Sequence, residues 1–253
     1  MKKSTVKEIR TRFDKDVERF SNLQKGQTST VDAVATLEIL SDSAKYLCPG
    51  ARDILDIGCG AGNYTLKILE KIPNLNCTLI DLSQPMLDKA RERVSNATDG
   101  EVICSPTDVR DFPVNEESFD IITAGAVLHH LRDESEWEAV FKKLFSLLKP
   151  GGVLLISDLV VQTLKPLNKL MWERYADYLK NLNGEAYQKD VFAYIVEEDS
   201  PRSYEFQQRK LNEAGFAYVE ILHKNMCFAT FCAVKEKSGG ELELMAPGET
   251  VPE

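Results

Sequence analysis

"ILDIGCGAGNY", residues 54–64, carries the strongest structural signal in the chain. Three glycines at alternate positions, Gly58, Gly60 and Gly62, follow an apolar run, and Asp56 stands two residues before the first of them. A glycine-rich turn between a buried strand and a helix lets a ligand approach the backbone closely. Its G-x-G-x-G spacing differs from the G-x-G-x-x-G of dinucleotide sites. Taken alone, the turn is compatible both with a ligand site and with a plain tight connection.

Outward from this turn, apolar runs of strand length alternate with segments of helical periodicity. Such alternation predicts a parallel sheet with helices on both faces. The predicted strands are residues 53–57, 76–81, 101–105, 118–124 and 153–158, and the predicted helices between them are residues 64–71, 84–95 and 134–148.

The two ends of the chain break this alternation. Before the first strand we expect two helices, residues 5–20 and 31–47, the second capped by Thr30. After the fifth strand an aromatic-rich helical segment, residues 159–199, precedes a helix at 202–214 and an antiparallel hairpin that turns around Lys224–Asn225. These segments predict N-terminal helices (1–50) over a ligand site, a core (51–158 and 200–236), a helical cap (159–199) and a disordered tail (237–253).

Composition and charge exclude several classes of function. A net charge of −9 with lysines and arginines interleaved among acids argues against a nucleic-acid surface. No apolar run approaches membrane-spanning length. The six cysteines include no C-x-x-C pair, which argues against a metal cage or a disulfide framework. We therefore expect a cytoplasmic enzyme with no metal, no membrane and no direct nucleic-acid partner.

Polar residues after the next strands indicate what the glycine turn binds. Asp81 ends the second strand, where an acid accepts hydrogen bonds from ribose hydroxyls, and Asp108 follows the third strand, where a carboxylate can accept from an adenine amino group. The small residues Ala124 and Gly125 end the fourth strand and leave room for a slim ligand. Neither a G-K-S/T sequence nor an arginine near the turn is available for phosphate, so the predicted ligand has an adenosine half without phosphate.

At this point the motifs "LDIGCGAG", "LIDLSQPML", "FDIITAGAVLHHL" and "LLKPGGVLLISD" together resemble class I S-adenosylmethionine-dependent methyltransferases. The resemblance implies a Rossmann-like, mostly parallel seven-stranded sheet of order 3-2-1-4-5-7-6, with only the seventh strand antiparallel and a helical cap inserted after strand 5. It implies S-adenosyl-L-methionine as cofactor. The cofactor residues it implies are Asp56, Gly58, Cys59, Gly60, Gly62, Asp81, Leu82, Asp108, Val109, Ala124 and Gly125.

A narrower resemblance lies in the last third of the chain, from "LMWERYADYL" to "NMCFATFCAVK", which is similar to carboxy-S-adenosylmethionine synthases of tRNA modification. The chain departs from those enzymes at two places. Its glycine turn has the ordinary methyltransferase form, and Lys210 stands where the synthases place the arginine that grips the extra carboxylate. Arg209 is one position earlier, a step that rotates a helical side chain by about 100°.

Candidates for catalysis and substrate binding are few. His129, after the fourth strand, is a candidate general base or else a residue that packs the following helix. Asp158 faces the pocket or caps the cap helix, and the aromatic pair Tyr175 and Tyr178 forms a lid, a core or a homodimer contact. The other substrate candidates are Phe13, Gln27 and Arg209. We interpret the acids at 197–199 as a solvated helix end.

Together these patterns predict a soluble methyltransferase with a small-molecule acceptor, because an inserted cap argues for an enclosed pocket. One alternative is a synthase that carboxylates the cofactor using prephenate and so feeds tRNA modification indirectly. The other is a non-catalytic scaffold that only binds S-adenosylmethionine.

Overall fold

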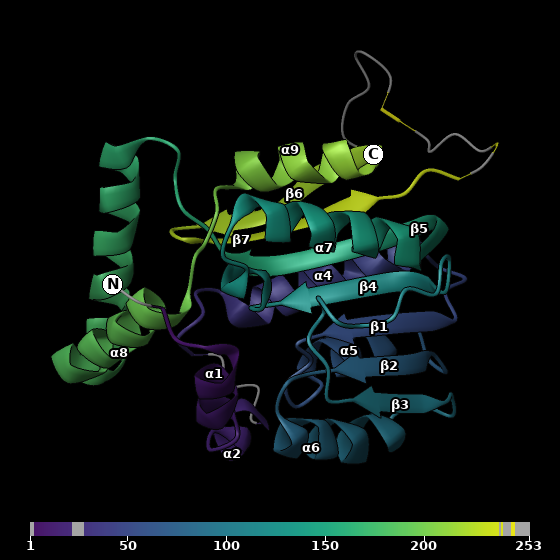
Figure 1. The fold of residues 1–253 in the computed structure, drawn as a ribbon, viewed down its shortest axis with the longest axis horizontal. Helices are drawn as coiled ribbons and strands as arrows, with labels where there is room; N and C mark the ends of the chain where they lie inside the picture. Colours follow the sequence, from purple (N-terminus) through teal and green to yellow (C-terminus); the bar gives the residue numbers. More distant parts are fainter. Residues whose placement is uncertain (1–2, 22–27, 238, 240–243, 246–253) are drawn as a thin grey trace, which may run out of the picture.

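The computed structural model describes residues 3–21, 28–237, 239 and 244–245. Its centre is a seven-stranded sheet of order β3-β2-β1-β4-β5-β7-β6 (Figure 1). Within the described residues β7 alone runs antiparallel to its neighbours, which confirms the predicted topology. The strands are β1 (Asp53–Ile57), β2 (Asn76–Ile80), β3 (Val102–Ser105), β4 (Phe119–Gly125), β5 (Leu148–Leu159), β6 (Tyr218–Asn225) and β7 (Phe228–Val234).

Helices cover both faces of the sheet because neighbouring strand residues point to opposite sides. Ile54 and Ile121 pack with one layer of helices, and Leu55 and Ile122 pack with the other. The first layer consists of α4 (Ala33–Leu47), α5 (Asn63–Leu69) and α6 (Gln84–Ser95); the second consists of α7 (Glu134–Leu147) and α9 (Tyr204–Ala214). Both faces are therefore buried, as a doubly covered parallel sheet requires.

The helical insertion after β5 is α8 (Lys165–Glu198), at the left of Figure 1. Its helical path breaks at Asn183–Gly184, where Gly184 has a positive φ of 86° that glycine adopts without strain. Tyr175, Leu179 and Ile195 of α8 form a third apolar cluster with the end of β5 and the β6–β7 turn. The insertion is thus packed onto one end of the sheet.

The N-terminal segment forms two short helices, α1 (Val6–Phe13) and α2 (Val17–Ser21), and not the single helix that we predicted. Thr5 begins α1 with a capping box: its side chain accepts from the Glu8 N–H and the Glu8 side chain accepts from the Thr5 N–H. No described helix is both long enough and apolar enough to span a membrane.

The predicted cap of α4 and the predicted position of the β6–β7 turn were both wrong, and the two places meet at Asp32. α4 begins at Ala33 after Asp32, which has a left-handed backbone, so Thr30 is not its cap. The β6–β7 turn lies after Asn225, at Met226 and its successor, because Asn225 still pairs with Phe228. The Asp32 carboxylate accepts hydrogen bonds from both Asn225 and His223, so this acid joins the hairpin to α4 and does not cap the helix. Most of the tail predicted to be disordered (237–253) lies outside the described residues.

Candidate active site

The glycine turn joins β1 to α5 at the sheet edge where the parallel strands end. Gly58 and Gly60 have positive φ values of 61° and 50°. A Cβ at Gly58 would lie 2.6 Å from Cγ2 of Val127, so the close approach of the β4 connection excludes a side chain there. A Cβ at Gly60 would meet no atom within 4 Å, because that side of the turn faces an open crevice.

Asp81, directly after β2, holds the turn in shape. One oxygen accepts the N–H of Gly60 at 2.9 Å and the other accepts the N–H of Ser83 at 2.8 Å. Burial raises the pKa of Asp81 even though these N–H groups favour its charge. A carboxylate has about four acceptor positions, so these N–H groups leave acceptor capacity for a hydroxyl group of a ligand in the crevice.

Asp56 lies beneath the turn. Its two oxygens accept the hydroxyl groups of Thr65 at 2.7 Å and Thr123 at 2.9 Å, and burial raises its pKa to about 6. The residue is 1% exposed and does not line the crevice. Its geometry therefore supports the turn from below, and any effect on a ligand passes through the turn.

One end of the crevice is formed by the connection after β3. Asp108 and Val109 line it, together with Asp81 and the segment that begins α1. The Asp108 carboxylate binds the Arg110 guanidinium through contacts of 2.8 and 2.6 Å. Burial would raise the pKa of Asp108, but Arg110 outweighs it and holds that pKa below its usual range. Asp108 is therefore a charged acceptor at this end.

The other end widens into a chamber beyond the glycine turn. Its walls come from α1, the ends of β4 and β5, α8 and the β6–β7 turn, and they are largely apolar and aromatic. The chamber wall includes Phe13, Tyr64, Asp158, Tyr175, Ile195 and Phe228. Gly125 leaves room for the Tyr64 ring, because a Cβ at position 125 would lie 2.2 Å from Cε2 of that ring.

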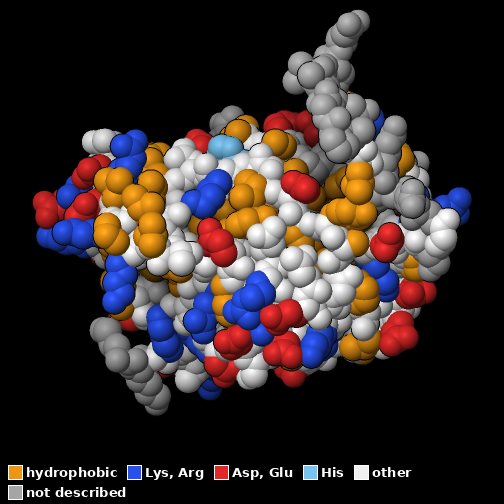
Figure 2. Space-filling view, turned by 90° about the horizontal axis from the view of Figure 1, so that it is seen from above, with side chains coloured by type: hydrophobic (Ala, Val, Ile, Leu, Met, Phe, Trp, Pro, Cys, Tyr) orange, Lys and Arg blue, Asp and Glu red, His pale blue; other side chains and the backbone are white. Residues whose placement is uncertain are grey.

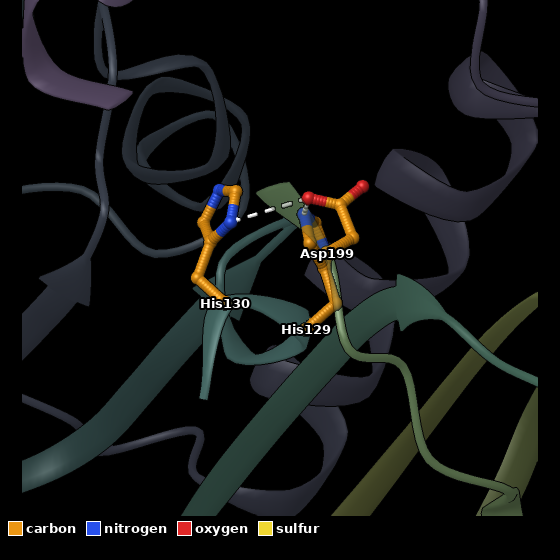
Figure 3. Close-up of side chains that lie close together, drawn as sticks. All are labelled: His129, His130 and Asp199. Atoms are coloured by element: carbon orange, nitrogen blue, oxygen red, sulfur yellow. Dashed lines mark ion pairs between the residues drawn. The ribbon is translucent and has the colours of Figure 1, made fainter. Parts of the chain in front are cut away.

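A histidine–aspartate cluster of His129, His130 and Asp199 lies in the chamber wall (Figure 3). The Nδ1–H of His129 donates to Asp158, whose other oxygen accepts the His129 backbone N–H at 3.1 Å. Asp199 lies 3.6 Å from Nε2 of His129 and 3.3 Å from Nδ1 of His130.

The charged groups of this cluster shift one another's pKa values. Burial lowers the pKa of His129, but Asp158 and Asp199 outweigh burial and raise it to about 9. Burial and the neighbouring imidazole lower the pKa of His130. Burial would raise the pKa of Asp199, but the two histidines hold it below its usual range. At neutral pH in the ligand-free protein, His129 is therefore a cation between two carboxylates.

Arg12 and Glu198 close the chamber from the side of α1. The guanidinium and the carboxylate form a two-point ion pair with contacts of 2.8 and 2.6 Å, and Glu198 is buried. The Ser4 N–H donates to the Glu197 carbonyl, and the Arg132 guanidinium donates to the Ser4 carbonyl, which adds to this attachment. α1 is consequently fixed to the end of α8 over the chamber (Figure 1).

Several of the predicted site residues are brought together, and others are not. The crevice and chamber walls include the predicted Gly58, Cys59, Gly60, Asp81, Leu82, Asp108, Val109, Gly125, Phe13, His129, Asp158 and Tyr175. Asp56, Gly62, Ala124, Tyr178 and Arg209 lie outside these walls, and Gln27 lies outside the described residues. Gly62 packs on α6, Ala124 is buried in β4, and the Tyr178 hydroxyl donates to the Thr28 carbonyl.

Two sequence interpretations need correction. Arg209 is exposed and pairs with Glu213 on its own helix, far from the chamber walls, because its position on α9 faces solvent. Of the acids at 197–199, Glu197 is exposed as predicted, but Glu198 and Asp199 are each only 5% exposed and are not solvated. Sequence reasoning missed Arg12, His130 and Asp199 as site residues, and the doubled histidine at 129–130 was the one signal that pointed to any of them.

Comparisons with known proteins agree with this geometry. A family model described as "Methyltransferase domain" matches residues 54–152. A demethylmenaquinone methyltransferase of Listeria monocytogenes serotype 4a (strain HCC23) is 30% identical over 190 residues, which cover 73% of this chain and 78% of the relative. A carboxy-S-adenosyl-L-methionine synthase of Shewanella loihica is 27% identical over 210 residues, covering 79% and 82% of the two chains.

Among solved structures, the 1,6-didemethyltoxoflavin-N1-methyltransferase of Burkholderia thailandensis, with bound S-adenosylhomocysteine, superposes with a TM-score of 0.60. Its sequence identity is 15%, and the match covers 92% of each chain, so this likeness concerns the fold. The matched sequence motifs, the strand order and the Listeria relative together place the protein in the family of class I methyltransferases, whose cofactor is S-adenosylmethionine.

Proposed function

We propose that the protein transfers the methyl group of S-adenosylmethionine to a small-molecule acceptor held in the chamber. The observation that supports this is the continuity of crevice and chamber: both include Gly58, Asp81 and His130 in their walls. A cofactor whose adenosine lies beside Asp108 and whose ribose lies on Asp81 would present its sulfonium group toward the chamber.

The walls favour an acceptor with an apolar or aromatic body. Phe13, Tyr175, Ile195 and Phe228 supply apolar surface, while the polar groups of the histidine–aspartate cluster lie at one side. Such a wall suits a ring that bears one ionisable hydroxyl or amine group. The Listeria relative is by its name a demethylmenaquinone methyltransferase, and an acceptor with a flat, largely apolar ring is compatible with such a relative.

The protein contributes geometry and water exclusion, because the sulfonium already activates the methyl group. The acceptor atom must approach in line with the S–CH₃ bond, and α1 and α8 close the space in which it does so. The cofactor contacts of the glycine turn, Asp81 and Asp108 belong to this proposal, and the histidine–aspartate cluster supplies the polar groups of the chamber wall.

Filling the chamber tests this proposal directly. Ile195→Phe adds bulk to the wall, whereas Val196→Phe adds the same ring one position away at an exposed site. With a panel of phenols, quinols and amines, the wild-type protein should release S-adenosylhomocysteine in an acceptor-dependent way. We expect Ile195→Phe to lower kcat/KM for the acceptor at least about tenfold, or about 1.4 kcal/mol, with unchanged S-adenosylhomocysteine affinity. Equal acceptor turnover by both variants would show that the acceptor binds elsewhere.

The synthase-like relative supports a second candidate, carboxylation of the cofactor with prephenate. The residue at the synthase grip position, Lys210, binds Glu134 of α7 at 2.9 Å and Glu213 of α9 at 2.8 Å and does not line the chamber. Incubation with prephenate followed by mass analysis of the bound nucleoside separates the two: a carboxylated cofactor favours the synthase. Multiple turnovers with any acceptor exclude a mere scaffold.

A homodimer through the cap also remains a prediction. Figure 2 shows apolar side chains on the side of the molecule where Figure 1 places α8, and Leu167 and Leu170 of that helix are exposed. Sedimentation velocity of the purified protein measures the assembly state, and Leu170→Glu should shift a dimer toward monomer.

A further inference from the structure

The histidine–aspartate cluster is assembled from two distant parts of the chain. His129 and His130 are consecutive residues of the short helix η1 (Leu128–His130), and Asp199 follows the end of α8. The Ser200 N–H donates to the His129 carbonyl at 2.7 Å, and this bond holds the Asp199 segment against η1. Figure 3 shows one Asp199 oxygen joined to the His130 ring by a dashed line, with the His129 ring beside that oxygen.

The distances within the cluster match those between ligands of one metal ion. Asp199 Oδ1 lies 3.3 Å from His130 Nδ1 and 3.6 Å from His129 Nε2, and one ligand atom of each residue lies within 4.8 Å of the others. Two ligands at metal–ligand distances of about 2.1 Å in tetrahedral geometry are about 3.4 Å apart. Small side-chain rotations therefore suffice to bring all three ligands onto one ion.

Two atoms of the cluster lack the partners that buried polar atoms normally have. His130 Nδ1 and Asp199 Oδ1 are inaccessible to solvent; they lie 3.3 Å apart as an ion pair, but neither has a hydrogen bond of acceptable geometry among the described residues. Asp199 is 5% exposed, and buried polar atoms without partners are uncommon in native proteins. A cation bound between these atoms would satisfy both.

Asp158 orients His129 in the way that metal-binding histidines are oriented. It accepts the His129 Nδ1–H, which leaves Nε2 directed to Asp199. A carboxylate behind a ligating imidazole fixes its tautomer and increases its basicity. The nearest guanidinium, that of Arg12, is already paired with Glu198 and does not occupy the cluster.

We propose that His129, His130 and Asp199 bind one divalent transition-metal ion at the wall of the chamber, with Asp158 as the supporting carboxylate. Two imidazoles and one carboxylate are a ligand set for Zn²⁺, Fe²⁺ or Mn²⁺. Because the three residues also line the chamber, the remaining coordination positions face the acceptor space, as in catalytic and not structural sites. This proposal departs from the sequence-based expectation of no metal.

The use of this ion rests on the proposed function, although its binding does not. A hydroxyl group of the acceptor that binds the ion loses its proton to solvent more readily. The oxygen then attacks the methyl carbon, the S–CH₃ bond breaks with its electrons remaining on sulfur, and the products are the methyl ether, S-adenosylhomocysteine and one proton.

Metal binding is measured on the full chain without cofactor or acceptor, so the result is independent of methyl transfer. Protein treated with EDTA is titrated with Zn²⁺ by calorimetry, and its metal content after dialysis is measured by mass spectrometry. We expect one Zn²⁺ per chain. Asp158→Asn should weaken binding by about 10–100-fold, and His130→Gln and Asp199→Asn should weaken it further.

His223→Gln is the matched control, because His223 lies on β6 and pairs with Asp32 away from the chamber. Thermal unfolding and S-adenosylhomocysteine binding verify that each variant is folded. Should Asp199→Asn fail to fold, His130→Gln decides the question, because its partly exposed side chain is replaced by one of similar reach.

The Co²⁺-substituted protein identifies the ligands by a second measurement. Ligand-field bands without thiolate charge-transfer absorption support the cluster. Failure of the wild-type chain to bind Zn²⁺, equal binding by His130→Gln and His223→Gln, or a thiolate band would overturn the proposal. If Zn²⁺ binds as expected but no acceptor is methylated, the metal site stands and only the proposed function fails.

Discussion

Replacing Asp81 is expected to weaken cofactor binding more than it weakens the fold. The carboxylate accepts N–H groups from Gly60 and Ser83, at 2.9 and 2.8 Å, and its remaining acceptor positions face the crevice. Asp81→Ala removes the partners of the turn and of the predicted ribose hydroxyls together.

The size of the effect follows from these contacts. A ribose hydroxyl left without its acceptor in a desolvated site costs about 1–3 kcal/mol, which corresponds to about 5–150-fold in Kd. The fold loses two charge-assisted bonds but is relieved of a carboxylate whose pKa burial has raised, so these terms offset each other in part. We expect unfolding free energy to fall by about 1–2 kcal/mol.

Calorimetric titration with S-adenosylhomocysteine and urea unfolding measure the two effects separately. Asp88→Ala is the control, because Asp88 is exposed on α6 and bonds only to Gln84 among the described residues. Asp81→Asn, which keeps one acceptor oxygen, should give an intermediate affinity. If Asp81→Ala binds S-adenosylhomocysteine as tightly as Asp88→Ala does, then Asp81 does not hold the ribose.

Three further perturbations follow from the structure. Glu198→Gln leaves the half-buried guanidinium of Arg12 without its charged partner and should lower the free energy of unfolding by about 2–3 kcal/mol in urea titrations. Glu197→Gln, at an exposed neighbouring position, should leave that free energy unchanged. Equal stabilities of the two variants would mean that the ion pair does not stabilise the fold. Burial raises the pKa of Asp56 from its ordinary value of 3.8 to about 6, so the folded state holds a proton that the unfolded state releases between these pH values. Its contribution to stability should therefore decline by about 2 kcal/mol as the pH rises from 4 to 6, and Asp56→Asn should abolish that decline; parallel wild-type and variant curves of unfolding free energy against pH would contradict this. Gly60→Val places a β-branched residue at positive φ and fills the open side of the turn, so calorimetry should detect no S-adenosylhomocysteine binding. Gly50→Val, at an exposed turn with open space, is the control, and binding by Gly60→Val would show that the cofactor lies elsewhere.

The sequence by itself predicted the alternation of strands and helices, the helical insertion after β5 and the glycine turn beside Asp81, whereas the sheet order was implied by the resemblance to class I methyltransferases. Strand alternation, helical periodicity and glycines at fixed offsets are local properties, so they can be predicted from one sequence. Boundaries were less certain where a distant residue intervened, as at the start of α4, where Asp32 pairs with the β6–β7 hairpin and leaves no helix cap.

Only the tertiary structure decided how the chamber is closed and which polar groups meet in it. Arg12 and Glu198 are separated by 186 residues, and no local pattern announces that they pair. The acids at the end of α8 have the composition of a solvated helix end, yet packing against α1 and η1 buries Glu198 and Asp199. This burial depends on where distant elements pack, so the local sequence does not reveal that Glu198 and Asp199 lie at the side of the site.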